Sequence, residues 1–277
     1  MQYATVRSDG VTTAAVRDGD GPWQRLDASD LSEWLLRGSV AAEPTDALAA
    51  PQLLLLLPLP SPGKVICCGL NYGDHIVEMG RALPTHPTLF AKFGDTLTGP
   101  DAVLEVPPGT LVDWEAELAV VVGQELRSAS EADAEDAIAG YTIANDISLR
   151  DWQNRTNEWL QGKAWDRTTP LGPVLVTPDE IDVNAGVDVI CRVNGEVVQR
   201  GNTATLVFGP AALLAYISTF TTLRPGDIVL TGTPGGVGAG RTPPQFLRDG
   251  DVVETEVPGI GTLRNAIRFT SDVLTTT

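Results

Sequence analysis

Short apolar runs recur along most of this chain, and glycine or proline separates one run from the next. Runs of this length that are rich in Val, Ile and Leu are typical of buried strands. They lie at residues 65–68, 118–122, 143–144, 174–176, 187–193, 227–231 and 252–257. Segments 131–139 and 210–219 predict helices, and acidic residues open the first, as the helix dipole favours. The pattern therefore predicts an α+β fold that is mainly β.

The first 59 residues form a pattern of their own. Apolar and polar positions predict strands at 3–6 and 11–16 and a short helix at 31–36. Pro58, Pro60 and Pro62 follow, and alternate prolines favour an extended connector. We expect a small N-terminal α+β domain over residues 1–59 and a larger main domain over residues 60–277.

Two acidic positions, Glu115 and Glu117, stand just before the run at 118–122. Side chains two residues apart in a strand point to the same face, so these carboxylates would lie side by side. On an exposed edge strand they would be ordinary surface charges. Inside the protein they would repel each other unless a cation or a shared proton compensated them. Asp146, which has apolar neighbours, is a further acid of this kind, and three carboxylates suit a hard divalent cation.

His75 and Glu78 stand three residues apart. If Asn71 or Asp74 caps a short helix there, both side chains share one face, and the carboxylate can orient the imidazole. A surface ion pair is the alternative. The chain has only two histidines, so a histidine-based metal site is not expected.

Glycines crowd the segment 235–240, which follows the run at 227–231. A phosphate-binding loop would need Lys where Arg241 stands and a helix where Pro243 and Pro244 follow, so a nucleotide site is not expected. Either these glycines let the backbone approach a ligand closely, or they form a surface turn.

Several motifs, read together, resemble those of the fumarylacetoacetate hydrolase family, in particular its short bacterial type related to acylpyruvate hydrolases and 2-hydroxyhepta-2,4-diene-1,7-dioate isomerases. The resemblance runs from about residue 60 to residue 267, with the motifs in the family's order. They are GLNYGDH (69–75) with Glu78, WEAEL (114–118), ND (145–146) with Arg150 and Gln153, GK (162–163), PLGP (170–173), VNGE (193–196), and PGD (225–227) with TGTPGGVG (231–238). The resemblance implies a mixed β-sandwich roll whose sheets curl around a metal site.

The resemblance also implies roles for individual residues. The family's metal ligands match Glu115, Glu117 and Asp146, its water-activating and proton-transfer dyad matches His75 and Glu78, and its charge-balancing lysine matches Lys163. Substrate contacts are expected from Tyr72, Arg81, Arg150, Gln153 and Thr233. An exposed position is the alternative for Lys163, and a buried salt bridge with Asp151 or Asp146 is the alternative for Arg150. The carboxylate set favours Mg²⁺ or Mn²⁺, with Ca²⁺ as a further choice.

The reaction implied first is metal-dependent hydrolysis of a C–C bond in a β-diketo acid, of the acylpyruvate or fumarylpyruvate type, through an enolate held by the metal, as in aromatic catabolism. Without an attacking water, the same residues would serve a lyase or isomerase on a related 2-oxo acid: an oxaloacetate decarboxylase, a 2-hydroxyheptadienedioate isomerase or a dehydratase. A non-catalytic binding module of the same fold is a third hypothesis, which the retention of all matching residues disfavours. The chain departs from common family patterns at Trp114 and at residues 160–161 and 165–167. We expect either that Trp114 and Trp165 narrow the pocket or that Arg167 or Arg81 recognises a substrate carboxylate.

The charge balance limits the partners. With 36 acidic and 19 basic residues, the formal net charge is −17, which disfavours nucleic acid and anionic membrane surfaces and leaves a small-molecule acid as the expected partner.

Three cysteines are too few for a disulfide framework and are expected to be small buried residues. The N-terminus lacks the pattern of a signal peptide, and the leucines at 53–57 are too few for a membrane span. We expect a cytoplasmic protein and, from the resemblance, a homodimer.

Overall fold

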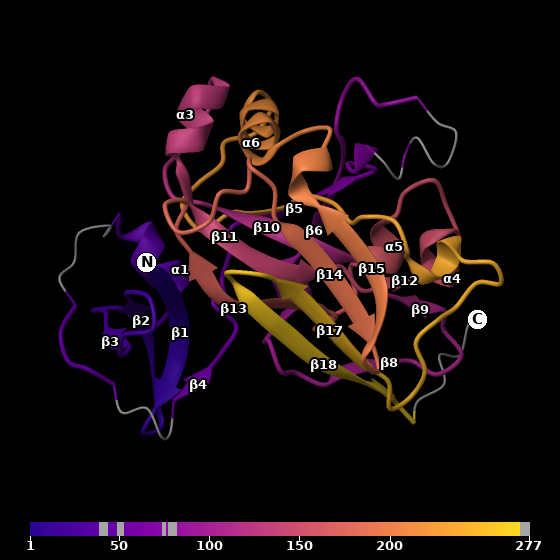
Figure 1. The fold of residues 1–277 in the computed structure, drawn as a ribbon, viewed down its shortest axis with the longest axis horizontal. Coiled ribbons are helices and arrows are strands. Elements are labelled where there is room, and N and C mark those ends of the chain that lie inside the picture. Colours follow the sequence, from indigo (N-terminus) through magenta and orange to yellow (C-terminus); the bar gives the residue numbers. More distant parts are fainter. Residues whose placement is uncertain (39–43, 49–52, 74–75, 77–81, 272–277) are drawn as a thin grey trace.

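Two sheets dominate the computed structural model, which describes residues 1–38, 44–48, 53–73, 76 and 82–271 (Figure 1). Within these residues the larger sheet has eleven strands. Its main path runs β3 (Gln24–Arg25), β2 (Val11–Arg17), β1 (Gln2–Ser8), β13 (Thr169–Val176), β11 (Ile138–Asn145), β10 (Ala116–Val122), β16 (Ile228–Leu230), β5 (Val65–Gly69) and β6 (Thr88–Lys92). Two short strands lie off this path: β4 (Leu54–Leu55) pairs with β1, and β7 (Leu97–Thr98) pairs with β13.

The second sheet has five strands and packs on the first. Its order is β15 (Glu196–Asn202), β14 (Asp188–Val193), β17 (Val252–Val257), β18 (Gly261–Phe269) and β8 (Leu104–Val106). Strands β10 and β11 contact β17 across the interface between the sheets. All seven residues of β10 are buried, because β11 and β16 flank the strand within its own sheet and the second sheet covers it. A separate pair joins β9 (Val112–Asp113) to β12 (Ser148–Leu149).

Helices are short and lie at the margins of the sheets (Figure 1). They are α1 (Leu31–Leu36), α3 (Glu131–Asp136), α4 (Arg150–Gln153), α5 (Leu160–Lys163) and α6 (Pro210–Ser218), with 3₁₀ turns η2 (Gly94–Thr96), η3 (Thr203–Thr205) and η4 (Gly238–Gly240). None of the helices in the described residues is both long and apolar enough to cross a membrane.

The mainly β fold with mixed sheets is confirmed: β10 pairs with β11 antiparallel, whereas β16 pairs with β5 parallel. Every predicted strand overlaps a strand of the structure, although β16 is shorter at both ends than the predicted 227–231, and the helices predicted at 31–36 and 210–219 are present. The helix predicted at 131–139 is wrong at its end, because α3 stops at Asp136 and Ile138 already pairs with Val122 of β10. The three cysteines are buried free thiols, as predicted.

The N-terminal strands join the large sheet through one edge. In β1, Gln2 pairs with Val176 and Tyr3 with Leu175 of β13. Figure 1 shows β1 to β4 and α1 gathered at one end of the molecule, beside β13. The division at residue 59 remains a prediction, and the sheet crosses it by this pairing.

Candidate metal centre

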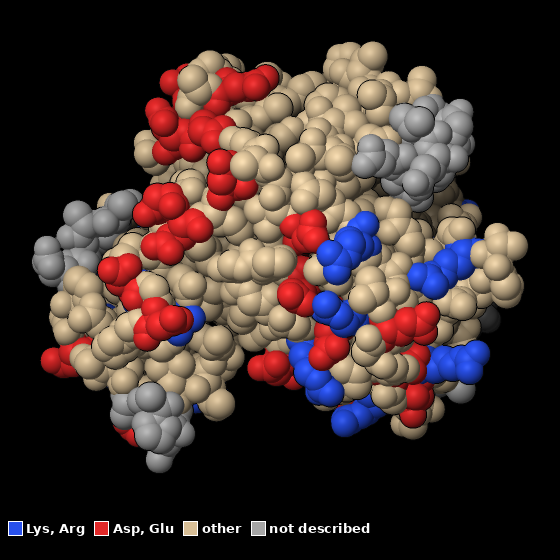
Figure 2. All heavy atoms as spheres, in the orientation of Figure 1, with Lys and Arg blue, Asp and Glu red and all other residues tan. Residues whose placement is uncertain are grey.

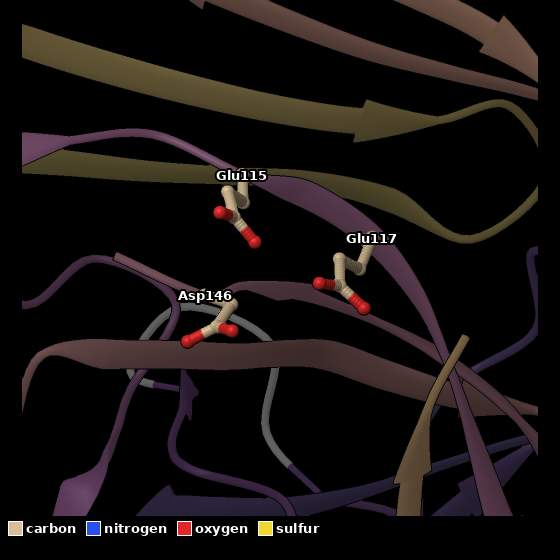
Figure 3. A group of neighbouring side chains, drawn as sticks. All are labelled: Glu115, Glu117 and Asp146. Carbon is tan, nitrogen blue, oxygen red and sulfur yellow. The ribbon is translucent and has the colours of Figure 1, made fainter. Parts of the chain in front are cut away.

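Three carboxylates meet where β10 and β11 lie side by side. Glu117 is the second residue of β10, Glu115 directly precedes the strand, and the pairing of Ala116 with Asn145 brings Asp146 beside them. One carboxylate oxygen from each of the three lies within 4.8 Å of the others, and all three residues are buried. Figure 3 shows the side chains of Glu115 and Glu117, from one segment, converging with that of Asp146 from another. We call Glu115, Glu117 and Asp146 the buried acidic cluster.

Three cationic side chains contact this cluster. The Lys163 Nζ lies 2.8 Å from both Glu115 Oε2 and Asp146 Oδ2. Arg150 Nη1 lies 2.7 Å from Glu115 Oε1, and Lys92 pairs with Asp146 Oδ1. Both lysines are almost fully buried. The cluster is therefore a fixed network of charges that water does not solvate.

The network changes the proton affinity of its members. Burial alone would raise the pKa of Asp146, but the ammonium groups of Lys163 and Lys92 outweigh it and hold that pKa below its usual value. Burial alone would lower the pKa of Lys163, but Asp146 and Glu115 raise it above its usual value. Asp146 is therefore a carboxylate and Lys163 an ammonium at neutral pH.

Glu117 differs from the other two acids. Its Oε2 accepts a hydrogen bond of 2.6 Å from the Gly232 backbone N–H, and no Lys or Arg in the described part of the chain forms an ion pair with it. Burial, followed by the charges of Asp146 and Glu115, raises its pKa well above the usual value. The cluster thus keeps an acid without a cationic partner, and a hard divalent cation held by the three carboxylates would offset its charge once it ionises.

A cavity of about 370 Å³ opens beside the cluster. Glu115, Lys163 and four of the predicted substrate-binding residues line it, namely Tyr72, Arg150, Gln153 and Thr233. The Tyr72 hydroxyl is buried and has no hydrogen-bond partner in the described residues. Burial also raises the pKa of Tyr72, so its hydroxyl keeps its proton. Such a group suits a ligand oxygen as its partner.

The Thr233 hydroxyl already forms hydrogen bonds that connect it to β10. It donates to the Ala116 carbonyl at 3.0 Å and accepts from Gln199 Nε2 at 2.8 Å. Gln199 Oε1 in turn accepts from the Ala116 N–H at 3.0 Å. Gln199, which the motifs did not single out, therefore links β10 to the loop that carries Thr233.

Arg150 forms buried ion pairs, but not with the expected partners. Its Nε lies 2.7 Å from Asp113 Oδ2 and its Nη1 contacts Glu115, whereas Asp151 accepts from the Leu111 N–H. The alternative of a salt bridge with Asp151 or Asp146 is wrong. The reason is the pairing of β9 with β12, which places Asp113 opposite Ser148 and close to Arg150.

The aromatic wall of the cavity also differs from the expectation. Trp159 and Phe90 line it and meet edge to face at 5.5 Å, whereas Trp114 and Trp165 do not line it. Arg167 lines a different cavity, together with residues of β1, β2, β4 and β7. The expected narrowing by Trp114 and Trp165 is therefore wrong, and Trp159 takes that place. The glycine-rich segment does reach the cavity, through Val237, Ala239 and Gly240.

Three predicted site residues lie outside the described residues: His75, Glu78 and Arg81. Residues 78–81, which begin the candidate lid segment 78–87, also lie outside the described residues. Their roles remain predictions. Lys92 was missed, and its only local signal is a Lys at the end of the apolar strand β6.

Both the sequence and the fold of this chain are similar to those of known proteins. The family model described as fumarylacetoacetate (FAA) hydrolase C-terminal matches residues 64–268. The chain is 46% identical over 223 residues to oxaloacetate tautomerase fahd2, mitochondrial, of Xenopus laevis, covering 79% of this chain and 70% of that protein. The fold is similar to that of two solved structures, and each match spans 98% of this chain and 100% of the other chain. One is 5-carboxymethyl-2-hydroxymuconate delta-isomerase of Mycobacterium smegmatis, with a TM-score of 0.83 and 33% identity. The other is fumarylacetoacetate hydrolase of Exiguobacterium antarcticum, with a TM-score of 0.86 and 34% identity. With its matching motifs and its buried acidic cluster, this chain belongs to the fumarylacetoacetate hydrolase family of enzymes.

Proposed function

We propose that the protein is a divalent-metal-dependent enol–keto isomerase of a 2-oxo acid, with oxaloacetate as the first substrate to test. The observation that carries the proposal is the meeting of the buried acidic cluster and the Lys163 ammonium beside one cavity. The names of the relatives support isomerisation over C–C cleavage, because the Xenopus protein is named a tautomerase and the M. smegmatis structure an isomerase.

A divalent ion held by Glu115, Glu117 and Asp146 would supply Lewis-acid polarisation of the substrate carbonyl, which makes the hydrogens on C3 more acidic. Lys163 keeps its charge beside that carbonyl, so its Nζ can donate to an oxygen that becomes negative. The unpartnered Tyr72 hydroxyl is a second donor for the same purpose. Both donors are buried and already in place, which makes them stronger than they would be in water.

Arg150 can bind a substrate carboxylate. Its Nε and Nη1 are engaged by Asp113, Glu115 and Gln153, but in the described part of the chain its Nη2 forms no hydrogen bond. Since the residue lines the cavity, the Nη2 hydrogens are available to an anionic ligand. We assign proton transfer at C3 to His75 and Glu78 because they match the family's dyad.

Hydrolysis of an acylpyruvate is the second candidate, because the E. antarcticum structure is named a fumarylacetoacetate hydrolase. Decarboxylation of oxaloacetate is a third outcome that the assay must separate. We also propose Mg²⁺ or Mn²⁺ as the ion and a homodimer as the assembly. The cytoplasmic location remains a prediction, and the Xenopus relative is named mitochondrial.

One substrate panel tests the proposal. Purified protein with Mg²⁺ or Mn²⁺ receives the enol form of oxaloacetate, and loss of enol absorbance is compared with the rate in metal and buffer alone. Pyruvate formation from oxaloacetate and loss of acetylpyruvate absorbance are followed in parallel, with chelated protein and His75→Ala as controls. We expect faster loss of the enol without pyruvate and without acetylpyruvate cleavage. Cleavage of acetylpyruvate with enol loss at the buffer rate would contradict the proposal and establish the hydrolase.

A further inference from the structure

Asp113 accepts four hydrogen bonds next to the candidate metal centre, and the reaction proposed above assigns it no part. The residue is fully buried at the end of β9. Its Oδ1 accepts from the backbone N–H groups of Trp114 (2.8 Å) and Gly238 (2.7 Å). Its Oδ2 accepts from the Ala239 N–H (2.9 Å) and from Arg150 Nε (2.7 Å). All four partners are donors, so both carboxylate oxygens serve as acceptors and no donor on this side chain is needed.

One side of this arrangement leads to a metal-binding residue. The guanidinium of Arg150 bridges two acids, since Nε contacts Asp113 and Nη1 contacts Glu115 Oε1 at 2.7 Å. Gln153 fixes the same Nη1 at 2.8 Å. Asp113 therefore fixes the orientation of Arg150 and shares its charge. Without Asp113, Glu115 would be the one described anion left to pair with this guanidinium. The stronger pairing with Arg150 would then weaken the binding of a divalent cation by Glu115.

The other side leads to the wall of the cavity. The amides of Gly238 and Ala239 belong to η4, and Ala239 and Gly240 line the cavity. The backbone approaches so closely here that a Cβ on Gly238 would lie 2.7 Å from Asp113 Oδ1 and 1.9 Å from the Gln245 carbonyl oxygen. Asp113 thus holds the glycine-rich segment 235–240, which we call the glycine loop, against the end of β9. The two lie more than a hundred residues apart in the sequence.

We propose that Asp113 is a positioning residue that sets both the charge available at Glu115 and the position of the glycine loop along the cavity. It touches neither the proposed substrate nor the metal, and it acts through Arg150 and through two backbone amides. The inference depends on the proposed metal-dependent function, because its effect is transmitted to a metal-binding residue.

The variant Asp113→Asn tests the proposal at almost constant volume. Whichever way the amide is oriented, its NH₂ group faces two donors, so one pair of contacts is lost. We expect the affinity for Mn²⁺, measured by electron paramagnetic resonance titration without substrate, to fall by about 10–100-fold, as for other groups that orient metal ligands. Asp227→Asn is the matched control. Asp227 is also buried and pairs with Lys64 at 3.0 Å, but it stands at the other end of β16 from Gly232, so its loss should affect stability and leave Mn²⁺ affinity unchanged.

A double-mutant cycle tests whether the effect passes through Arg150. Lys cannot reach both acids with two nitrogens, so in an Arg150→Lys background Asp113→Asn should lower Mn²⁺ affinity by much less than tenfold. This cycle also serves if Asp113→Asn alone folds poorly, because Arg150→Lys by itself should weaken Mn²⁺ binding. Equal Mn²⁺ affinity in wild type and Asp113→Asn, or an undiminished effect in the Arg150→Lys background, would overturn the inference. Failure of the wild type to bind Mn²⁺ would instead remove the proposed function itself.

Discussion

Two acidic regions of this molecule contain the same kinds of side chain in opposite surroundings. The buried acidic cluster lies where β10 and β11 run side by side, and Lys163, Arg150 and Lys92 contact two of its members. A second set, which we call the acidic face, surrounds α3 and the loop before β14, and all its members are exposed (Figure 2). It consists of Glu131, Asp133, Glu135, Asp136, Asp179, Glu180 and Asp182.

Solvation explains the difference in their partners. On the acidic face, the only ion pair among the described residues joins Glu180 to the N-terminal amine of Met1. Water screens the other charges, which therefore need no fixed cation. The buried acids have lost that water, and fixed cations offset two of them while Glu117 stays without one. The comparison indicates that burial and incomplete charge compensation, and not the number of acids, distinguish the buried acidic cluster as a candidate metal centre.

Removing a buried cation should have the largest effect on stability. In Lys163→Met, Glu115 and Asp146 each lose a contact of 2.8 Å, and we expect the free energy of unfolding in chelator to fall by about 3 kcal/mol. Added Mn²⁺ should restore part of this loss, because it supplies positive charge to the same carboxylates. Urea unfolding with and without Mn²⁺ measures both effects. Lys64→Met is the control, since it leaves Asp227 unpaired where Mn²⁺ cannot help, and unchanged stability of Lys163→Met in chelator would contradict the account.

Replacing Glu117, the acid without a cationic partner, should act in the opposite direction. Glu117 has a raised pKa in the folded protein, so folding disfavours its ionisation and stability falls as the pH rises from about 4.5 through that raised pKa. Glu117→Gln lacks this loss and can still accept from the Gly232 N–H. We expect it to be more stable than the metal-free wild type by about 1–3 kcal/mol at neutral pH, with weaker Mn²⁺ binding.

Denaturation of both proteins in chelator across the pH range checks this prediction. The stability difference should grow with pH and then level off. Glu105→Gln, an exposed acid paired with Arg268, provides the control and should show no such trend. A constant difference at all pH values would exclude uncompensated charge as its cause.

Removing three acids from the acidic face should have the smallest effect. The combined variant Glu131→Gln, Asp136→Asn and Asp182→Asn removes as many charges as the buried acidic cluster contains, and these residues are exposed. Each substitution should change the free energy of unfolding by no more than about 0.5 kcal/mol. Mn²⁺ affinity should stay within about twofold of the wild type at moderate salt. Thermal unfolding and the same Mn²⁺ titration test both statements.

Local pattern predicted one part of the site and not another. The spacing of Glu115 and Glu117 at the start of an apolar strand was enough to place them on one face, because alternation is a property of the strand itself. The apolar neighbours of Asp146 marked it as a buried acid. The meeting of all three carboxylates is confirmed.

The residues around them depend on topology and were therefore missed. Lys92 looks like a surface lysine in its local sequence, and only Asp146, 54 residues away, explains its burial. Asp113 meets Gly238 across 125 residues, and Gln199 meets Ala116 across 83 residues. The end of α3 was misplaced for the same reason, since β10 draws Ile138 into β11.

The most direct test counts metal ions on three proteins. Equilibrium dialysis with Mn²⁺ followed by elemental analysis is applied to the wild type, to Glu115→Ala and to the triple variant of the acidic face. In Glu115→Ala, Lys163 keeps Asp146 and Arg150 keeps Asp113 as partners, so the fold should persist and circular dichroism can verify it. The account predicts about one tightly bound Mn²⁺ per chain for the wild type and the triple variant and none for Glu115→Ala. Tight binding retained by a folded Glu115→Ala, or lost from the triple variant, would contradict the assignment of the buried acidic cluster as the metal centre.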